Sequence, residues 1–328
     1  MTLAMHGQPA ESAPQPPTSF PARPPNQAKA RSRRKAWVRR LPLLPALLFV
    51  AVTTQVPFGV TLVVSLLTWN ALYPERRGFA GLRNFRKVFE SDELRTSLLT
   101  TIVLTVIVVV VSLVLGLILA LLLDRRFRGR AAVRTMLIAP YLVVPVAAAL
   151  LWKHALLNPA YGLVNGIIKW TWGLFGSSAA PQPAWIADHP LASVEASLVW
   201  QWTPFMALIL LAGLQSKPLD ALEAARIDGA GHWQTFRYII LPHLRRYLEL
   251  GALLGSIYIV QNFDAVYTMT AGGLGTANLP YSIYQAFFQT QDYGLTSAMG
   301  VLVVIGTMII ATFALRVVSS LFKEEISR

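Results

Sequence analysis

The residues that could do chemistry fall into two groups, and the first is a polar stretch set between apolar segments. Residues 223–244 read EAARIDGAGHWQTFRYIILPHL. Glu223 and Asp228 bracket a run of small side chains, and Gly229 follows. Small side chains on one helix face let another surface approach closely. The two carboxylates could form ion pairs with basic groups on that surface. Spacing alone supports two interpretations equally: an amphipathic loop on the lipid surface, or a docking site for another protein.

Helix signals divide this stretch in two. Residues 216–220, Ser-Lys-Pro-Leu-Asp, are typical of a helix start, because proline is tolerated in the first turn and an acid there suits the helix dipole. The Gly-Ala-Gly run ends that helix, since glycine accepts left-handed backbone angles at little cost. We expect a second helix from His232 to about Leu241, with Pro242 at its far end or at a bend.

The second group consists of polar side chains inside apolar segments, where they are costly and point to function. Amides and carboxylates suit the hydroxyl groups of an uncharged polyhydroxylated solute, and aromatic rings suit its C–H faces. Hydrogen bonding between helices explains each amide equally well, and packing explains the tryptophan and phenylalanine rings better. The carboxylate at 264 lies near an outer end, where it could instead cap a glycine-rich turn. The candidates are Gln201, Trp202, Thr203, Pro204, Phe205, Tyr258, Gln261, Asn262 and Asp264.

No motif for catalysis or nucleotide binding is present in the sequence. There is no G-x-x-x-x-G-K-[ST] loop, no H-E-x-x-H and no cysteine, and the five histidines are scattered. We therefore expect no enzyme activity, no metal site and no cofactor in this chain. If ATP drives its function, the ATP must bind to a separate subunit.

Composition indicates an integral membrane protein. Charged residues make up only 14% of the chain and hydrophobic residues 54%, whereas soluble chains are about 25% charged. Six apolar stretches can each cross a hydrocarbon core roughly 30 Å thick as a helix. The predicted fold class is therefore all-α, with six transmembrane helices. The stretches are 41–69, 98–123, 135–152, 192–214, 248–267 and 295–318.

The distribution of basic residues predicts the orientation. If both termini lie in the cytoplasm, the cytoplasmic segments hold 21 of the 29 lysines and arginines, a bias that favours this topology. The net charge of +13 then reports orientation and does not indicate nucleic-acid binding. The outer segment 76–95 is itself basic, and its apolar residues recur at helical spacing, which predicts a short interfacial helix.

Three regions organise the chain. Residues 1–40 form a Pro-rich, basic tail that we expect to be disordered in the cytoplasm. Residues 41–322 form the six-helix transmembrane domain, with a cytoplasmic loop at 216–246, and residues 323–328 form a cytoplasmic end. Within the fifth stretch, Gly251 and its neighbour four residues on, Gly255, permit close helix packing.

The polar stretch resembles a known signature. From Glu223 the pattern E-A-A, three residues, G, nine residues, I-x-L-P is similar to the signature loop of inner-membrane permeases of binding-protein-dependent ABC importers. The form DGAGHWQTFRYIILPHL and the segment 262–288 resemble the carbohydrate branch, which imports sugars and sugar alcohols. That branch commonly has proline after its Gly-Gly pair, where this chain has Leu274.

The resemblance implies a type I ABC importer permease in a bacterial inner membrane. Two homologous permeases, expected here as a heterodimer, would enclose a solute path. A dimer of ATP-binding subunits would receive their signature loops, and an extracytoplasmic binding protein would deliver solute. Glu223 would pair with a basic residue of an ATP-binding subunit. The coupling residues so implied are Glu223, Ala224, Ala225, Asp228 and Gly229, and the sugar contacts are Gln201, Trp202, Phe205, Tyr258 and Asn262, with Asp264 as a further candidate.

Two alternatives remain open, an ion-coupled secondary transporter and an ABC permease for a non-sugar solute. Secondary transporters usually place several ionisable groups near the middle of the membrane. The six predicted stretches contain almost none apart from Glu249 and Asp264, both near stretch ends. The sequence alone does not name the solute.

Overall fold

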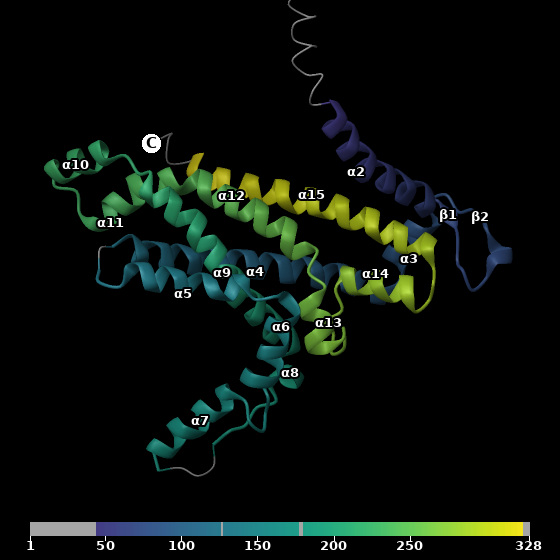
Figure 1. Cartoon of the computed structure of the whole chain (residues 1–328), viewed down its shortest axis with the longest axis horizontal. Coiled ribbons are helices and arrows are strands. Elements are labelled where there is room, and N and C mark those ends of the chain that lie inside the picture. Colours follow the sequence, from purple (N-terminus) through teal and green to yellow (C-terminus); the bar gives the residue numbers. More distant parts are fainter. Residues whose placement is uncertain (1–43, 126, 177–179, 324–328) are drawn as a thin grey trace, which may run out of the picture. The chain divides into compact units, whose positions relative to one another are not determined.

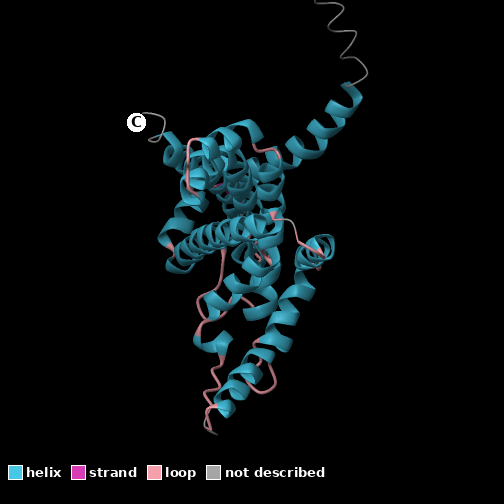
Figure 2. Ribbon diagram, turned by 90° about the vertical axis from the view of Figure 1, so that its left-hand side faces the viewer, coloured by secondary structure: helices cyan, strands magenta, loops and turns pink. Residues whose placement is uncertain are grey.

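The computed structural model describes residues 44–125, 127–176 and 180–323. Figures 1 and 2 show that helices make up nearly all of the described chain, which confirms the predicted all-α class. The predicted N-terminal tail, residues 1–40, and residues 324–328 of the C-terminal end lie outside the described residues.

α2, Leu44–Ser65, corresponds to the first predicted apolar stretch. It spans the point, after Phe58, at which the chain divides into two compact units. This helix of 22 residues contains an 18-residue window with a mean hydropathy of 2.0, which is that of a membrane span. All the other described helices and strands belong to the second unit, residues 59–328.

The segment after α2 is short, and hydrogen bonds from Asn84 connect it to the end of α2. Asn84 is buried, and its amide donates to the backbone oxygens of Ser65 and Leu67 at 2.9 and 2.8 Å. These bonds hold the next helix, α3, against the end of α2. α3 confirms the short helix predicted in this segment. The elements are β1 (Leu67–Thr68) paired antiparallel with β2 (Gly78–Phe79), η2 (Pro74–Arg76) between them, and α3 (Arg83–Glu90).

α4, Asp92–Asp124, has 33 residues and is about 50 Å long at 1.5 Å per residue. Ser91 caps its first turn, since its Oγ accepts the N–H of Leu94 at 3.4 Å. Two acids in that turn suit the positive end of the helix dipole. α4 is therefore a single long helix whose first turn is stabilised by a side-chain cap and by two acids.

The helices α4, α9 and α12 pack closely at glycines (Figure 1). A Cβ atom at Gly116 of α4 would lie 2.8 Å from Met206 Cβ and 2.9 Å from the backbone nitrogen of Ala207, both in α9. Gly251 and Gly255 of α12 likewise lie against side chains of α4 and α9, which confirms the close packing predicted there. The helix bounds are α9 (Pro190–Gln215), α12 (Leu241–Val260) and α15 (Tyr293–Lys323).

In the described chain, four helices are long and apolar enough to cross a membrane: α2, α4, α9 and residues 293–313 of α15. A fifth candidate is bent by 95° at residues 143–144, so the third predicted stretch is not one straight helix. Pro145 lacks an N–H group and disfavours a helical conformation in the residue before it. The bent pair consists of α5 (Arg130–Leu142) followed by α6 (Pro145–Leu150) and η3 (Leu151–Leu156).

The fifth predicted stretch, 248–267, is also divided. α12 ends at Val260, and a new helix, α13, begins after a three-residue break. Among the described helices, α12 does not count as an apolar span, because three charged residues lie in its first turns. The remaining elements are α7 (Leu163–Leu174), α8 (Trp185–Asp188), α10 (Leu219–Ile227), α11 (His232–Thr235), η4 (Phe236–Ile240), α13 (Asp264–Thr270) and α14 (Leu279–Phe288).

The contact at Gly116 predicts a stability difference between two glycine substitutions. Gly116→Ala should destabilise the protein by about 1–3 kcal/mol, because the new methyl group meets the α9 backbone. Gly306→Ala, in α15, is the matched control, since a Cβ there has no neighbour within 4 Å. Thermal unfolding of both variants in detergent measures the difference. Equal unfolding temperatures would contradict the packing described.

Candidate functional site

The polar loop, residues 216–246, begins with α10 and a glycine turn. The N–H groups of Gly229 and Ala230 donate to the carbonyls of Arg226 and Ala225 at 3.2 and 2.9 Å. This pair of bonds is a Schellman cap. Gly229 has φ +78°, a conformation that a residue without Cβ adopts at little cost. The predicted end of the first helix is confirmed.

The second helix of the loop does not end where the sequence suggested. The backbone is helical from His232 through α11, η4 and α12 to Val260. The sequence predicted that this second helix ends or bends at Pro242. Instead, the N–H of Leu241 donates to the carbonyl of Phe236, five residues back. This wider π turn accommodates the proline while the helix continues.

The predicted coupling residues lie on the surface of the loop. Ala225 is half-buried, whereas the other four, Glu223 among them, are exposed. Within the described part of the chain, the carboxylates of Glu223 and Asp228 make no hydrogen bond or ion pair. Ile227 is 86% exposed and Trp233 69%. Exposed apolar side chains beside free charges are typical of a protein contact surface.

The base of the loop is tied to the spanning helices. Lys217 forms an ion pair with Asp124, at the C-terminal end of α4. Ser216 Oγ lies 2.7 Å from the Tyr247 hydroxyl, which joins the end of α9 to the start of α12. A Cβ at Gly213 would lie 2.6 Å from the Tyr247 ring, so the two helices touch there. These contacts connect both ends of the polar loop to α4, α9 and α12.

Sequence reasoning missed these anchors. Asp124 and Lys217 are separated by 93 positions, and neither belongs to a motif. Tyr247 follows two arginines at the start of α12 and looked like part of a helix boundary. A polar residue at the end of an apolar stretch, next to the polar loop, is the only signal that could have indicated them.

Three of the predicted path residues meet in an aromatic cluster. Trp202 and Phe205 of α9 have ring centroids 5.7 Å apart, and Trp202 lies 5.5 Å from Tyr258 of α12. Tyr141 of α5, which sequence reasoning missed, stacks on Phe205 at 5.1 Å. Tyr258 is 55% exposed. The aromatic cluster, Tyr141, Trp202, Phe205 and Tyr258, offers ring faces to which the C–H groups of a sugar can bind.

The remaining path candidates have different surroundings. Gln201 is buried, and its Nε2 donates to the backbone oxygen of Val143 at 3.0 Å, so this amide supports the bend between α5 and α6. Asn262 lies in the break after α12, and its buried Oδ1 has no partner among the described residues. Asp264 is half-buried in the first turn of α13. The structure does not bring these three into the aromatic cluster.

One carboxylate within a predicted apolar stretch was overlooked in the sequence. Glu195 is the sixth residue of α9, and it corrects the expectation that Glu249 and Asp264 were nearly the only ionisable groups in the predicted stretches. Glu195 is half-buried.

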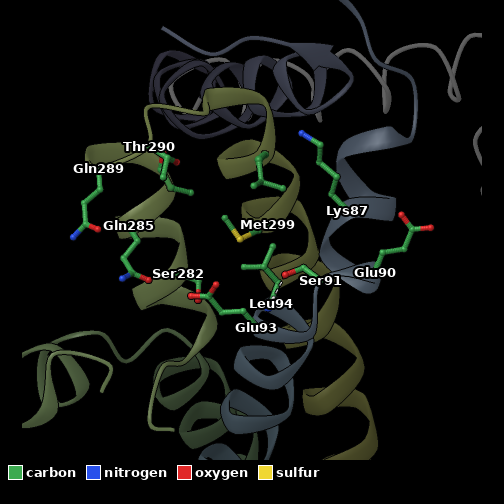
Figure 3. Close-up of a pocket in the computed structure, with 12 residues that line it drawn as sticks. Lys87, Glu90, Ser91, Glu93, Leu94, Ser282, Gln285, Gln289, Thr290 and Met299 are labelled. Atoms are coloured by element: carbon green, nitrogen blue, oxygen red, sulfur yellow. Dashed lines mark hydrogen bonds between the residues drawn. The ribbon is translucent and has the colours of Figure 1, made fainter. Parts of the chain in front are cut away.

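A polar cleft of about 570 Å³ lies at the other end of α4 from the polar loop. Glu93, in the first turn of α4, lines this cleft, whereas Asp124 at the last turn pairs with Lys217. Figure 3 shows Lys87 and Glu90 on one side, Gln285 of α14 and Gln289 just after it on the other, and Met299 between them. The cleft and the polar loop are thus separated by the length of α4, which exceeds the thickness of a bilayer core.

Comparison with known proteins identifies the family. Residues 112–323 match the family described as "Binding-protein-dependent transport system inner membrane component". The chain is 33% identical over 273 residues to the trehalose/maltose transport system permease protein of Thermococcus litoralis, covering 82% of this chain and 89% of that protein. It is 31% identical over 289 residues to the trehalose transport system permease protein of Mycobacterium tuberculosis, covering 87% and 91%.

The fold is also similar to that of a solved structure. The chain superposes with a TM-score of 0.73 on a chain from the crystal structure of a bacterial ABC transporter involved in the import of the acidic polysaccharide alginate. The sequences are 20% identical, and the superposition covers 90% of this chain and 100% of that chain. This chain belongs to the family of binding-protein-dependent transport system inner membrane components, and it is a membrane-embedded transport subunit and not an enzyme.

Proposed function

We propose that this chain is one of two permease subunits of an ATP-driven importer for a sugar or sugar alcohol, and that it forms half of the solute path. One observation carries the proposal: the polar loop and the aromatic cluster share two helices. α9 leads into the loop and carries Trp202 and Phe205, while α12 leads out of it and carries Tyr258. Motion of the loop therefore reaches the rings through continuous helix.

The proposed assembly has a second, homologous permease and a dimer of ATP-binding subunits that receives the polar loop. Glu223, Ala224, Ala225, Asp228 and Gly229 form the contact, with Glu223 pairing with a basic residue. The exposure of this surface and its free carboxylates support the assignment. An extracytoplasmic binding protein delivers the solute at the opposite end of the molecule, where the polar cleft lies.

The proposed topology has six spans in a bacterial inner membrane, with both termini in the cytoplasm. The permease domain covers residues 41–322. The third span is the bent α5–η3 segment, and the fifth is α12 continued by α13. Charged residues near the start of α12 suit a helix that enters the membrane from the cytoplasmic loop. The excess of basic residues in the cytoplasmic segments supports this orientation.

The proposed solute is an uncharged sugar or sugar alcohol. Relatives named for trehalose and maltose support this class. In the spanning region, the aromatic cluster supplies ring faces. The Oδ1 of Asn262 is buried and has no partner among the described residues, so it would accept a hydroxyl hydrogen only after a movement of the helices that exposes it. Asp264, in the adjoining helix, adds a second acceptor for hydroxyl groups.

Reversing the charge at Glu223 tests the docking surface. Glu223→Arg should abolish uptake of labelled trehalose by the complete transporter, since it would repel the basic group of the ATP-binding subunit, while the chain still inserts. Asp220→Arg is the matched control, because it makes the same charge change in the first turn of α10. We expect the control to retain most of the uptake. Undiminished uptake by Glu223→Arg would exclude the docking role.

The energy source can be tested with the complete transporter in proteoliposomes. Uptake should stop when vanadate is added or ATP is removed, because this chain has no phosphate-binding loop of its own. A proton uncoupler should act only indirectly. Uptake without ATP, driven by a proton or sodium gradient, would instead identify a secondary transporter.

The aromatic cluster predicts a change in apparent affinity. Tyr258→Ala should raise the KM for uptake several-fold, since one lost ring contact is worth about 1 kcal/mol, whereas Tyr258→Phe should keep it. Phe313→Ala is the control, because that ring is 66% exposed on α15 and lies outside the cluster. If the Tyr258 and Phe313 variants behave alike, the ring at 258 has no role in the solute path.

A further inference from the structure

The polar cleft at the start of α4 continues along the bundle as an apolar groove. On α4 the cleft is lined by Leu94, and the groove is lined by Leu98, one turn further on. On α15 Met299 lines the cleft and Leu302 lines the groove. Both helices begin beside the cleft, at residues 92 and 293. The groove, with a volume of about 270 Å³, therefore follows the cleft along the same two helices.

α14 forms a further wall of both spaces. Ser282 lines the cleft, and Leu279, three residues earlier, lines the groove. The hydroxyl of Ser282 donates to Ser97 Oγ at 2.9 Å, and the N–H of Leu279 donates to Thr101 Oγ1 at 2.8 Å. α14 is thus antiparallel to α4, and one turn of it separates the two spaces. The cleft and the groove are consecutive levels between the same three helices, α4, α14 and α15.

The groove leaves no polar side chain to pair with an occupant. Its lining is aliphatic or aromatic apart from Gly306 and Thr101. The Thr101 hydroxyl is already used, since it donates to a carbonyl four residues back at 2.7 Å and accepts the N–H of Leu279. Along α15 the groove extends over residues 302–310, about 12 Å. Its size suits one hydrocarbon chain and not a helix, which is about 10 Å across.

The cleft, in contrast, presents one positive and one negative group. Lys87 Nζ makes only a long ion pair with Asp292, at 3.9 Å, and 48% of its side chain is exposed. Glu93 is exposed, and its carboxylate makes no hydrogen bond or ion pair with any described residue. The other carboxylate, Glu90, is paired with Arg86 Nε at 2.5 Å. In Figure 3 the ammonium group of Lys87 and the carboxylate of Glu93 lie apart in the cleft. This arrangement suits a zwitterion.

The polar side chains favour one class of lipid headgroup. Lys87 can hold a phosphate, and Glu93 can accept hydrogen bonds from a primary ammonium group. Gln285 and Gln289 make no side-chain hydrogen bond within the described part of the chain, and their amides can donate to phosphate oxygens. A choline headgroup cannot donate to Glu93, and a glycerol headgroup offers it no positive charge. A sugar would leave both charges unpaired and the groove unfilled.

We propose that the cleft and the groove together bind one molecule of phosphatidylethanolamine. Its phosphate lies on Lys87, its ammonium group on Glu93 and one acyl chain in the groove. The depth agrees with this assignment, because the headgroup lies at the start of two apolar helices, α4 and α15, and the chain lies along them. The lipid belongs to the outer leaflet if the proposed topology holds, whereas the binding itself does not depend on the proposed function.

The headgroup assignment is tested by lipid binding. Native mass spectrometry of the complete transporter, delipidated in detergent and titrated with single lipids of the same acyl chains, measures the affinity. Phosphatidylethanolamine should bind several-fold more tightly than phosphatidylcholine or phosphatidylglycerol. Glu93→Gln should weaken its binding on the order of tenfold, because the ammonium group loses a charged acceptor. Glu75→Gln, an exposed acid outside the cleft, is the control and should bind as the wild type does. Equal affinities for the three lipids would overturn the headgroup assignment.

The role of the groove is tested by filling it. Gly306→Leu places a side chain in the groove, where a Cβ has no neighbour within 4 Å, and it should weaken binding of phosphatidylethanolamine on the order of tenfold. Gly59→Leu in α2, where a Cβ is equally free, is the control. Glycerophosphoethanolamine, the headgroup without acyl chains, should not compete. Unchanged binding by Gly306→Leu, or displacement of the lipid by trehalose, would overturn the proposal. Neither result would affect the proposed function, since no transport is measured.

Discussion

In a hydrocarbon environment, backbone polar groups must find their hydrogen bonds within the protein. That constraint shapes this molecule most clearly at the two places where its spanning segments stop being helical. At the first, the amide of Gln201 donates to the carbonyl of Val143, between α5 and α6. At the second, the amide of Asn278 donates to the carbonyl of Asn262, between α12 and α13. An amide side chain from elsewhere in the fold supports each break.

The two breaks also locate the aromatic cluster. Tyr141 lies two residues before the first break, and Tyr258 lies three residues before the second. Trp202 and Phe205 of the unbroken α9 bring the two together. An irregular backbone tolerated at membrane depth usually lines a cavity or a path. The aromatic cluster thus lies next to the two breaks in the helices. The glycine contacts among α4, α9 and α12 fix the positions of the helices that carry Trp202, Phe205 and Tyr258.

The sequence predicts most of the fold and part of the candidate site. Long apolar runs predict α2, α4, α9 and α15 because hydropathy is a local property. The glycine turn after α10 can also be predicted from local sequence, because the tolerance of Gly229 for a positive φ depends only on the residue type. The breaks within the third and fifth stretches depend on side chains distant in the chain, and so does the pairing of Asp124 with Lys217. Glu195 is visible in the sequence, but its lack of a partner appears only when its neighbours are known.

In the proposed mechanism, the continuous helix from His232 to Val260 works as a lever. It is about 43 Å long at 1.5 Å per residue, so a tilt of about 10° at one end displaces the other by about 7 Å. Because no hinge interrupts it, the loop and the ring of Tyr258 also keep a fixed angular phase. Removing one residue between them would turn the ring by about 100° relative to the loop. In the proposed mechanism, the number of residues in this segment sets both the size and the direction of the movement that reaches the ring of Tyr258 from the polar loop.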